Sequence, residues 1–185
     1  MKLHSRNMAD RSHPPGPAVE TRAWRVFYTR ARSEKKCEER LQERSVEVLV
    51  PKRIVQSRWS DRTKRIEEPL FRNYVFAHVD EKERLQVLRV PGIVRSVTFE
   101  GKPAQVRTDE VENLRLLMKA QERLSVVDLR PQVGNTVTLT DGPLKGLTGE
   151  VLEHRGRTSL LVRIDSIQQA IRVEIAAGWV TEVSS

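Results

Sequence analysis

The clearest alternation of side chains along the chain lies in the segment Tyr74–Val79. Successive side chains of a β-strand point to opposite faces, so the segment predicts a strand with one small, aliphatic face. The other face carries Tyr74, Phe76 and His78, and Phe71 precedes it in a turn marked by Arg72-Asn73. The aliphatic face is typical of packing on a core. The strand therefore has a second, aromatic face whose role the rest of the chain has to explain.

Aromatic residues make up only 5% of the chain, so three of them within six positions are a concentration. Such rings most often cover a helix of the same protein. Exposed aromatic patches, in contrast, usually mark partner-binding sites. Both interpretations stay open on the strand alone.

A second alternating segment, Ala23–Thr29, predicts a central strand because apolar residues fall on both of its faces. A helix should follow, with Ser33 as its N-cap and with Cys37 and Leu41 turned toward the sheet. Lys36, Arg40 and Arg44 recur at four-residue intervals on an adjacent stripe. That stripe suits contact with phosphates, or equally a solvated face paired with neighbouring glutamates.

The next hydrophobic segments predict a short strand at 46–51 and a hairpin formed by residues 54–59 and 62–67. The outer part of the hairpin is strongly basic, with Arg58, Arg62 and Lys64 near its end, followed by Arg65. Such an arm would lie along nucleic acid, or would carry its charge only for solubility. The hairpin alone does not separate these two roles.

Helical periodicity returns in two places. Residues 81–89 predict a short helix with Leu85 and Leu88 turned inward, and a strand is expected at 94–99. The longest helix should begin at Thr108, with an apolar stripe of core residues formed by Val111, Leu114, Leu117 and Met118. The order of elements in residues 22–124 predicts an α+β fold, an α/β sandwich with an antiparallel sheet.

The pattern changes after this helix. Residues 125–131 have no helical period and end at a proline, so they predict a linker. Residues 132–185 then contain several short β-branched runs separated by glycines, which predicts a small C-terminal β-barrel. Five residues of this part also fit a helical stripe: Leu160, Ile164, Ile167, Ile171 and Ile175. The β-branched bias favours strands over that alternative.

Composition narrows the class of protein. The 185 residues carry a net charge of +8, which favours a polyanionic or acidic partner. Residues 1–21 have almost no apolar content and predict a disordered tail. A single cysteine, Cys37, excludes an intramolecular disulfide and suits a cytoplasmic protein. No apolar run approaches the roughly 20 residues of a membrane helix, so we expect no membrane association.

Four blocks, in order, resemble the NusG family of transcription elongation factors. They are Trp24–Tyr28 with its following helix, the segment Pro69–Phe76, the turn Arg89–Val94, and Val137–Gly149, which is similar to the KOW motif. In the last block the matching residues are Asp141, Gly142, Pro143, Gly146 and Gly149. Arg72-Asn73 replaces the Pro-Gly of the general factor and looks more like the specialised, RfaH-like antitermination paralogues.

The resemblance implies an N-terminal NGN domain that binds the clamp helices of RNA polymerase. The residues that match this contact are Tyr28, Phe71, Tyr74 and Phe76, with Trp24 either beside them or in the core. Each ring buried against a partner contributes roughly 1.5–3 kcal/mol. A factor that bridges the polymerase in this way would suppress pausing or termination. The resemblance favours a specialised regulator of a few long operons over a general elongation factor.

The resemblance also implies contact with non-template or upstream DNA. The basic residues at matching positions are Arg30, Lys36, Arg40 and Arg44. The KOW domain would recruit a ribosomal protein, a termination factor or RNA, and the factor is expected to be a monomer. The alternative among binding proteins is a ribosome-associated, RNA-binding KOW protein that acts independently of RNA polymerase.

An enzyme is the other rival class, and the sequence argues against it. The four histidines are scattered, and one cysteine provides no zinc-ligand spacing. The chain also has no phosphate-binding glycine loop and no nucleophile elbow. We therefore expect no catalysis, no metal and no cofactor.

Overall fold

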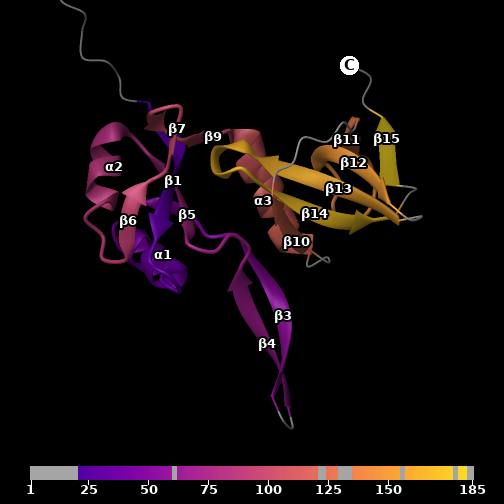
Figure 1. Cartoon of the computed structure of the whole chain (residues 1–185), viewed down its shortest axis with the longest axis horizontal. Helices are drawn as coiled ribbons and strands as arrows, with labels where there is room; N and C mark the ends of the chain where they lie inside the picture. Colours follow the sequence, from indigo (N-terminus) through magenta and orange to yellow (C-terminus); the bar gives the residue numbers. More distant parts are fainter. Residues whose placement is uncertain are drawn as a thin grey trace, which may run out of the picture.

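The computed structural model describes residues 21–59, 62–120, 124–128, 135–154, 157–176 and 179–182. Nearly all of the predicted disordered tail lies outside these residues, as does the end of the predicted linker, residues 129–131. Within the described parts the fold is rich in sheet and contains three α-helices. The elements form two bodies, and a two-stranded arm extends away from both (Figure 1).

The first body is built on an antiparallel sheet with the strand order β2-β5-β1-β6, in which β9 also pairs with β1. Its strands are β1 (Ala23–Thr29), β2 (Glu47–Leu49), β5 (Tyr74–Val79), β6 (Ile93–Ser96) and β9 (Gln105–Val106). Strands β7 (Thr98–Phe99) and β8 (Lys102–Pro103) form a separate small hairpin. The helices are α1 (Glu34–Gln42), α2 (Glu81–Val87) and α3 (Thr108–Ala120).

The helices cover opposite faces of this sheet. Cys37 and Leu41 of α1 are fully buried against the aliphatic face of β5, which confirms their predicted direction. Helix α2 packs on the same face, but through Val87, because Leu85 is 50% exposed. The prediction that Leu85 points inward is therefore wrong. Helix α3 belongs to the core on the aromatic face, with Val111, Leu114 and Leu117 buried as the stripe predicts.

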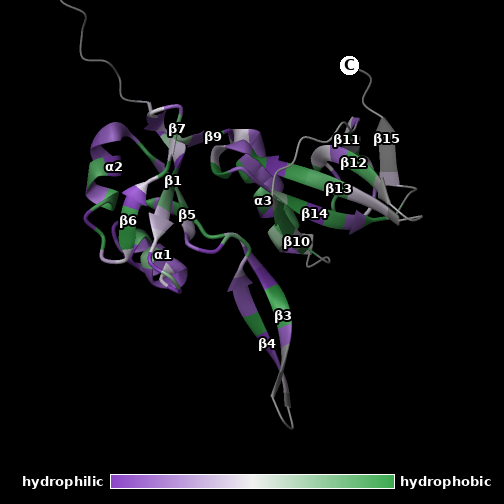
Figure 2. Ribbon diagram, in the orientation of Figure 1, coloured by the Kyte–Doolittle hydropathy of each residue, from purple (hydrophilic) through white to green (hydrophobic). Residues whose placement is uncertain are grey.

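The second body is a six-stranded sheet with the order β10-β14-β13-β12-β11-β15 and antiparallel pairing throughout. The strands are β10 (Leu124–Asp128), β11 (Thr136–Leu139), β12 (Thr148–His154), β13 (Arg157–Ile164), β14 (Gln169–Ile175) and β15 (Val180–Glu182), with a 3-10 turn η1 (Asp165–Ile167) between β13 and β14. Much of β13 appears as hydrophobic, green ribbon (Figure 2). The residues of the alternative helical stripe lie on β13, η1 and β14.

One segment differs from its prediction. Residues 124–128 form strand β10, although the sequence predicted an irregular linker from residue 125. All five residues of β10 pair with β14, from Leu124 opposite Val173 to Asp128 opposite Gln169. Pairing with β14 gives this short segment partners for its backbone groups.

Candidate functional site

The predicted docking residues come together on neighbouring strands. Tyr28 of β1 lies opposite Tyr74 of β5, and Trp24 lies opposite His78. The Tyr28 and Tyr74 rings meet edge to face, with centroids 5.6 Å apart and planes at 78°. Phe76 contacts Phe71 in the same way, at 5.9 Å. The alternation of the two strands therefore builds one aromatic face, as predicted.

Most of this face is not open to solvent. Phe76 is 0% exposed, Phe71 1% and Trp24 5%. The three residues belong to one continuous core that also contains the apolar stripe of α3 and the buried face of the second sheet. The expectation of exposed rings is therefore wrong for Phe71 and Phe76, whereas Trp24 takes the core position that the sequence had left open. The stripe of α3 needs an apolar surface to cover, and the aromatic face supplies it.

The accessible part of the face is formed by Tyr28 and Tyr74, which are both half-buried. The guanidinium of Arg95, from β6, lies 5.4 Å from the centroid of the Tyr28 ring. Asn73 Nδ2 donates a hydrogen bond to the Tyr28 hydroxyl at 3.3 Å. We call Tyr28, Tyr74 and Arg95 the tyrosine patch. Arg95 is absent from the predicted set because its contact depends on the pairing of β1 with β6, two strands far apart in sequence.

The turn before β5 is fixed by Asn73, whose φ is 67°. Glycine adopts this left-handed conformation most readily, and asparagine tolerates it better than most other residues. The Asn73 amide N–H donates to Glu34 Oε1 at 2.7 Å, and its carbonyl accepts from the Thr29 amide at 2.8 Å. One residue thus ties the end of β1 and the start of α1 to the tyrosine patch.

The basic candidates are not a uniform stripe. Arg30, Lys36 and Arg44 are exposed, whereas Arg40 is half-buried and donates from Nη1 to the Pro91 carbonyl at 2.5 Å. Helix α1 ends at Gln42, so Arg44 lies beyond it and the predicted four-residue spacing does not extend to Arg44. Lys36 borders a cavity of about 830 Å³ that is also lined by Arg72 and Asn73. These two residues form the turn that leads into the tyrosine patch.

Arg30 and Arg40 meet at the turn between α2 and β6. The Arg30 amide donates to the Gly92 carbonyl at 2.9 Å, one residue after the acceptor of Arg40. Gly92 has a φ of +103°, and a Cβ atom there would lie 2.7 Å from the Cys37 sulfur. The turn accordingly requires glycine.

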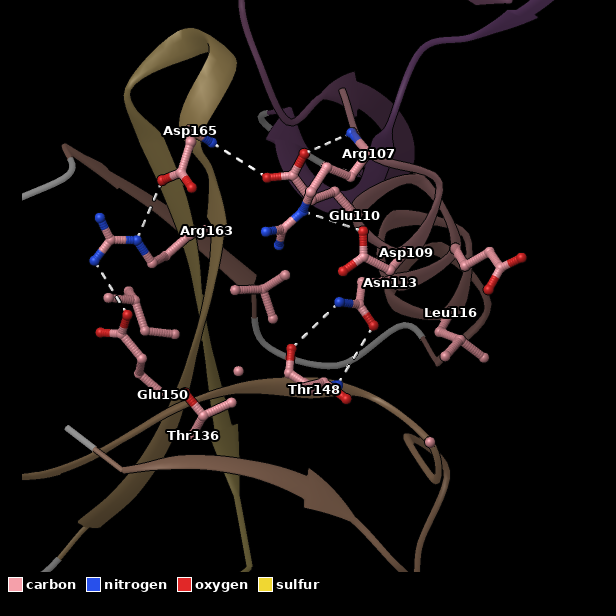
Figure 3. A pocket seen from close by; sticks show the side chains of 15 residues that line it. Arg107, Asp109, Glu110, Asn113, Leu116, Thr136, Thr148, Glu150, Arg163 and Asp165 are labelled. Carbon is pink, nitrogen blue, oxygen red and sulfur yellow. Dashed lines mark hydrogen bonds and ion pairs between the residues drawn. The ribbon is translucent and has the colours of Figure 1, made fainter. Parts of the chain in front are cut away.

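A second cavity, of about 550 Å³, lies between α3 and the second sheet (Figure 3). The Asn113 side chain joins its two sides: Nδ2 donates to the Thr148 carbonyl at 3.3 Å, and Oδ1 accepts from the Thr148 amide at 3.4 Å. Glu110, 4% exposed, accepts from the amides of Arg107 and Asp165. Burial raises the pKa of the Glu110 carboxyl above its ordinary value.

The residues of the predicted KOW motif lie in and after the turn between β11 and β12. Asp141 accepts a hydrogen bond from the Gly142 amide at 2.8 Å. Gly142 has a φ of +78°, and a Cβ atom there would lie 2.6 Å from the Trp179 ring. Pro143 and Gly146 complete the turn, and Gly149 lies on β12 opposite Val137. Both ends of the motif are therefore held by packing.

The part of the chain that the structure describes contains no group of three or more His, Cys, Asp or Glu residues arranged to hold a metal ion. Among its helices, none is long and apolar enough to cross a membrane.

These features define a sheet-and-helix body with an aromatic strand face, followed by a second, all-β body. The sequence profile described as "Transcription termination factor nusG" matches residues 22–115, and the chain belongs to the NusG family. The match covers the first sheet with α1 and α2 and the first part of α3.

Relatives and a solved structure agree with this assignment. The transcription termination/antitermination protein NusG of Rickettsia bellii is 24% identical over 169 residues, which cover 85% of this chain and 88% of that protein. The protein of the same name from Lactococcus lactis is 24% identical over 176 residues, covering 88% and 94%. The solved Thermotoga maritima NusG, at 21% identity, covers 89% of this chain and 98% of its own with a TM-score of 0.51, which supports a common fold.

Proposed function

We propose that this NusG family protein is a transcription elongation and antitermination factor that binds the clamp helices of RNA polymerase through its aromatic face. The observation that carries the proposal is the half-buried Tyr28–Tyr74 pair, which strand register brings together on the accessible part of the aromatic face. In this conformation the tyrosine patch makes the first contact. Trp24, Phe71 and Phe76 support the strands beneath it.

The mechanism requires no chemistry. A factor that binds one conformation of the polymerase better than another shifts the population toward the conformation it prefers. Holding the clamp closed would disfavour the open states that lead to pausing and termination. Arg30, Lys36 and Arg44 would then meet upstream or non-template DNA, with Arg40 positioning the turn beside them. Arg72-Asn73 is where the chain resembles the specialised, RfaH-like paralogues. This resemblance favours action on a few long operons.

The second sheet is proposed to act as a KOW barrel that recruits a ribosomal protein or a termination factor. The turn Asp141–Gly146 offers the loop for that contact. A general elongation factor with the same contacts is the second candidate. Sequencing of nascent transcripts with and without the protein separates the two, because a general factor would change many operons and a specialised one a few long ones.

The direct test is a pull-down with a clamp-helix fragment. Tyr28→Ala with Tyr74→Ala should lower the affinity at least tenfold, since each ring contributes more than about 1 kcal/mol when it is a binding hot spot. The matched control is Phe99→Ala, which removes a 48% exposed ring from β7. Phe71→Ala is unsuitable, because emptying a buried site costs about 3–5 kcal/mol of stability. Undiminished binding by the tyrosine double variant would refute the docking face.

A further inference from the structure

The arm formed by β3 (Lys52–Trp59) and β4 (Arg62–Pro69) has no part in the proposed polymerase and KOW contacts. The two strands pair only with each other, through eight residue pairs from Lys52 opposite Pro69 to Trp59 opposite Arg62. Eight residues of strand reach about 25 Å. The arm projects from the first body and away from both sheets (Figure 1). Such a projection presents two faces and two edges to solvent.

Charge is distributed unevenly along the arm. At its base the cations are matched with acids: Lys52 Nζ lies 2.5 Å from Glu38, and Arg53 lies 3.6 Å from Glu68. Lys35 of α1 likewise pairs with Glu67 at 3.9 Å. The outer segment, residues 56–65, contains four cations and a single acid. The base is therefore close to neutral, while the outer half is strongly positive.

The register places cations on both faces of the ribbon. Lys64 and Arg65 are neighbours in β4 and lie opposite Ser57 and Gln56, so they fall on opposite faces. Each face thus has at least one cation. A ribbon that rested on a flat acidic surface would use only one of these faces.

We propose that the arm inserts into the major groove of B-form DNA. The groove is about 12 Å wide and admits a two-stranded β-ribbon, and phosphates line both of its walls. Cations on both faces would then each face a phosphate backbone. The deep major groove of A-form RNA is too narrow for side chains to read, and a single strand provides no second wall. This contact is independent of polymerase binding and separate from the Arg30, Lys36 and Arg44 surface.

The test measures binding of the full chain to a labelled DNA duplex of about 30 base pairs, roughly three helical turns, by fluorescence anisotropy. The arm variant combines Arg58→Gln, Arg62→Gln and Lys64→Gln. The control variant combines Lys82→Gln, Arg89→Gln and Lys102→Gln, three exposed cations of the same body. Both variants lose the same net charge, so a general electrostatic effect would weaken them equally.

The arm variant should bind at least tenfold more weakly than the wild type at about 100 mM salt, and the control within about threefold. The slope of log K against log salt should fall in magnitude by about 2–3 in the arm variant, because each phosphate contact contributes about 0.9. Equal losses in the two variants, or no loss in the arm variant, would overturn the proposal.

Two further measurements sharpen the assignment. Double-stranded RNA and single-stranded DNA of the same length should bind more weakly, and the arm variant should lower their affinities no more than the control variant does. An equal loss on single-stranded DNA would overturn insertion into a groove. The arm variant should still bind the clamp-helix fragment like the wild type, so failure here and failure of the proposed polymerase contact are distinguishable.

Discussion

At the scale of single residues, Asn73 shows how one backbone conformation supports the tyrosine patch. Its φ of 67° is unfavourable for a residue with an ordinary Cβ atom. We expect Asn73→Ala to lower the free energy of unfolding by about 1 kcal/mol, because alanine is strained at positive φ. Asn73→Gly should stay close to the wild type, since glycine adopts this φ freely. Urea denaturation measures both, and equal stability of the two variants would contradict the explanation.

Sequence alone predicts which way side chains point better than how deeply they are buried. The alternation of Tyr74, Phe76 and His78 follows from the pleat of one strand, and it is correct. The burial of Phe76 depends on α3, whose apolar stripe begins 35 residues later in the chain. The apolar stripe of α3 and the aromatic face of β5 each predict that some apolar surface covers them. Neither pattern predicts that they cover each other.

At the scale of elements, locally determined features are recovered and distant pairings are not. Strands β3 and β4 pair across a short turn, so alternation and turn residues identify the hairpin. Strand β10 pairs with β14, more than 40 residues away, and its five residues carry too little pattern of their own. The sequence misplaces Arg44 for another reason: its spacing continues the basic stripe of α1, but the helix ends at Gln42.

Helix α2 depends on a capping box at its first turn. Asp80 Oδ1 accepts from the Glu83 amide at 2.7 Å, and Glu83 Oε2 accepts from the Asp80 amide at 3.0 Å. Asp80→Ala should lower the free energy of unfolding by about 1 kcal/mol, because the first turn loses a hydrogen-bond acceptor. Asp80→Asn keeps an acceptor oxygen and should retain most of that stability. Thermal unfolding compares the two, and an equal loss in both would assign the effect to charge instead.

At the scale of the whole molecule, α3 joins the two bodies. Its apolar stripe completes the core on the aromatic face, while Asn113 and Glu110 contact the backbone of the second sheet at Thr148 and Asp165. The sequence indicated the two bodies separately. It did not indicate this junction, because the paired groups are 35 and 55 positions apart and their bonds depend on how the bodies meet.

Glu110 makes the stability of this junction depend on pH. Burial raises the pKa of its carboxyl in the folded chain above the ordinary value of 4.5. The folded state therefore binds this proton more tightly than the unfolded state, and the contribution of Glu110 to stability is greatest below the ordinary pKa. That contribution is lost as the pH rises through the raised pKa, because a buried carboxylate then has to ionise in the folded protein.

The variant Glu110→Gln stays neutral at every pH, so it should not share this loss. We expect the free energy of unfolding of the wild type, relative to the variant, to fall as the pH rises above the ordinary carboxyl pKa of 4.5, as the linkage relation requires. Urea denaturation at a series of pH values measures the difference. Glu112→Gln, at an exposed position of the same helix, accounts for the change in net charge. A wild-type-to-variant difference that rises with pH would contradict burial as the dominant influence on Glu110.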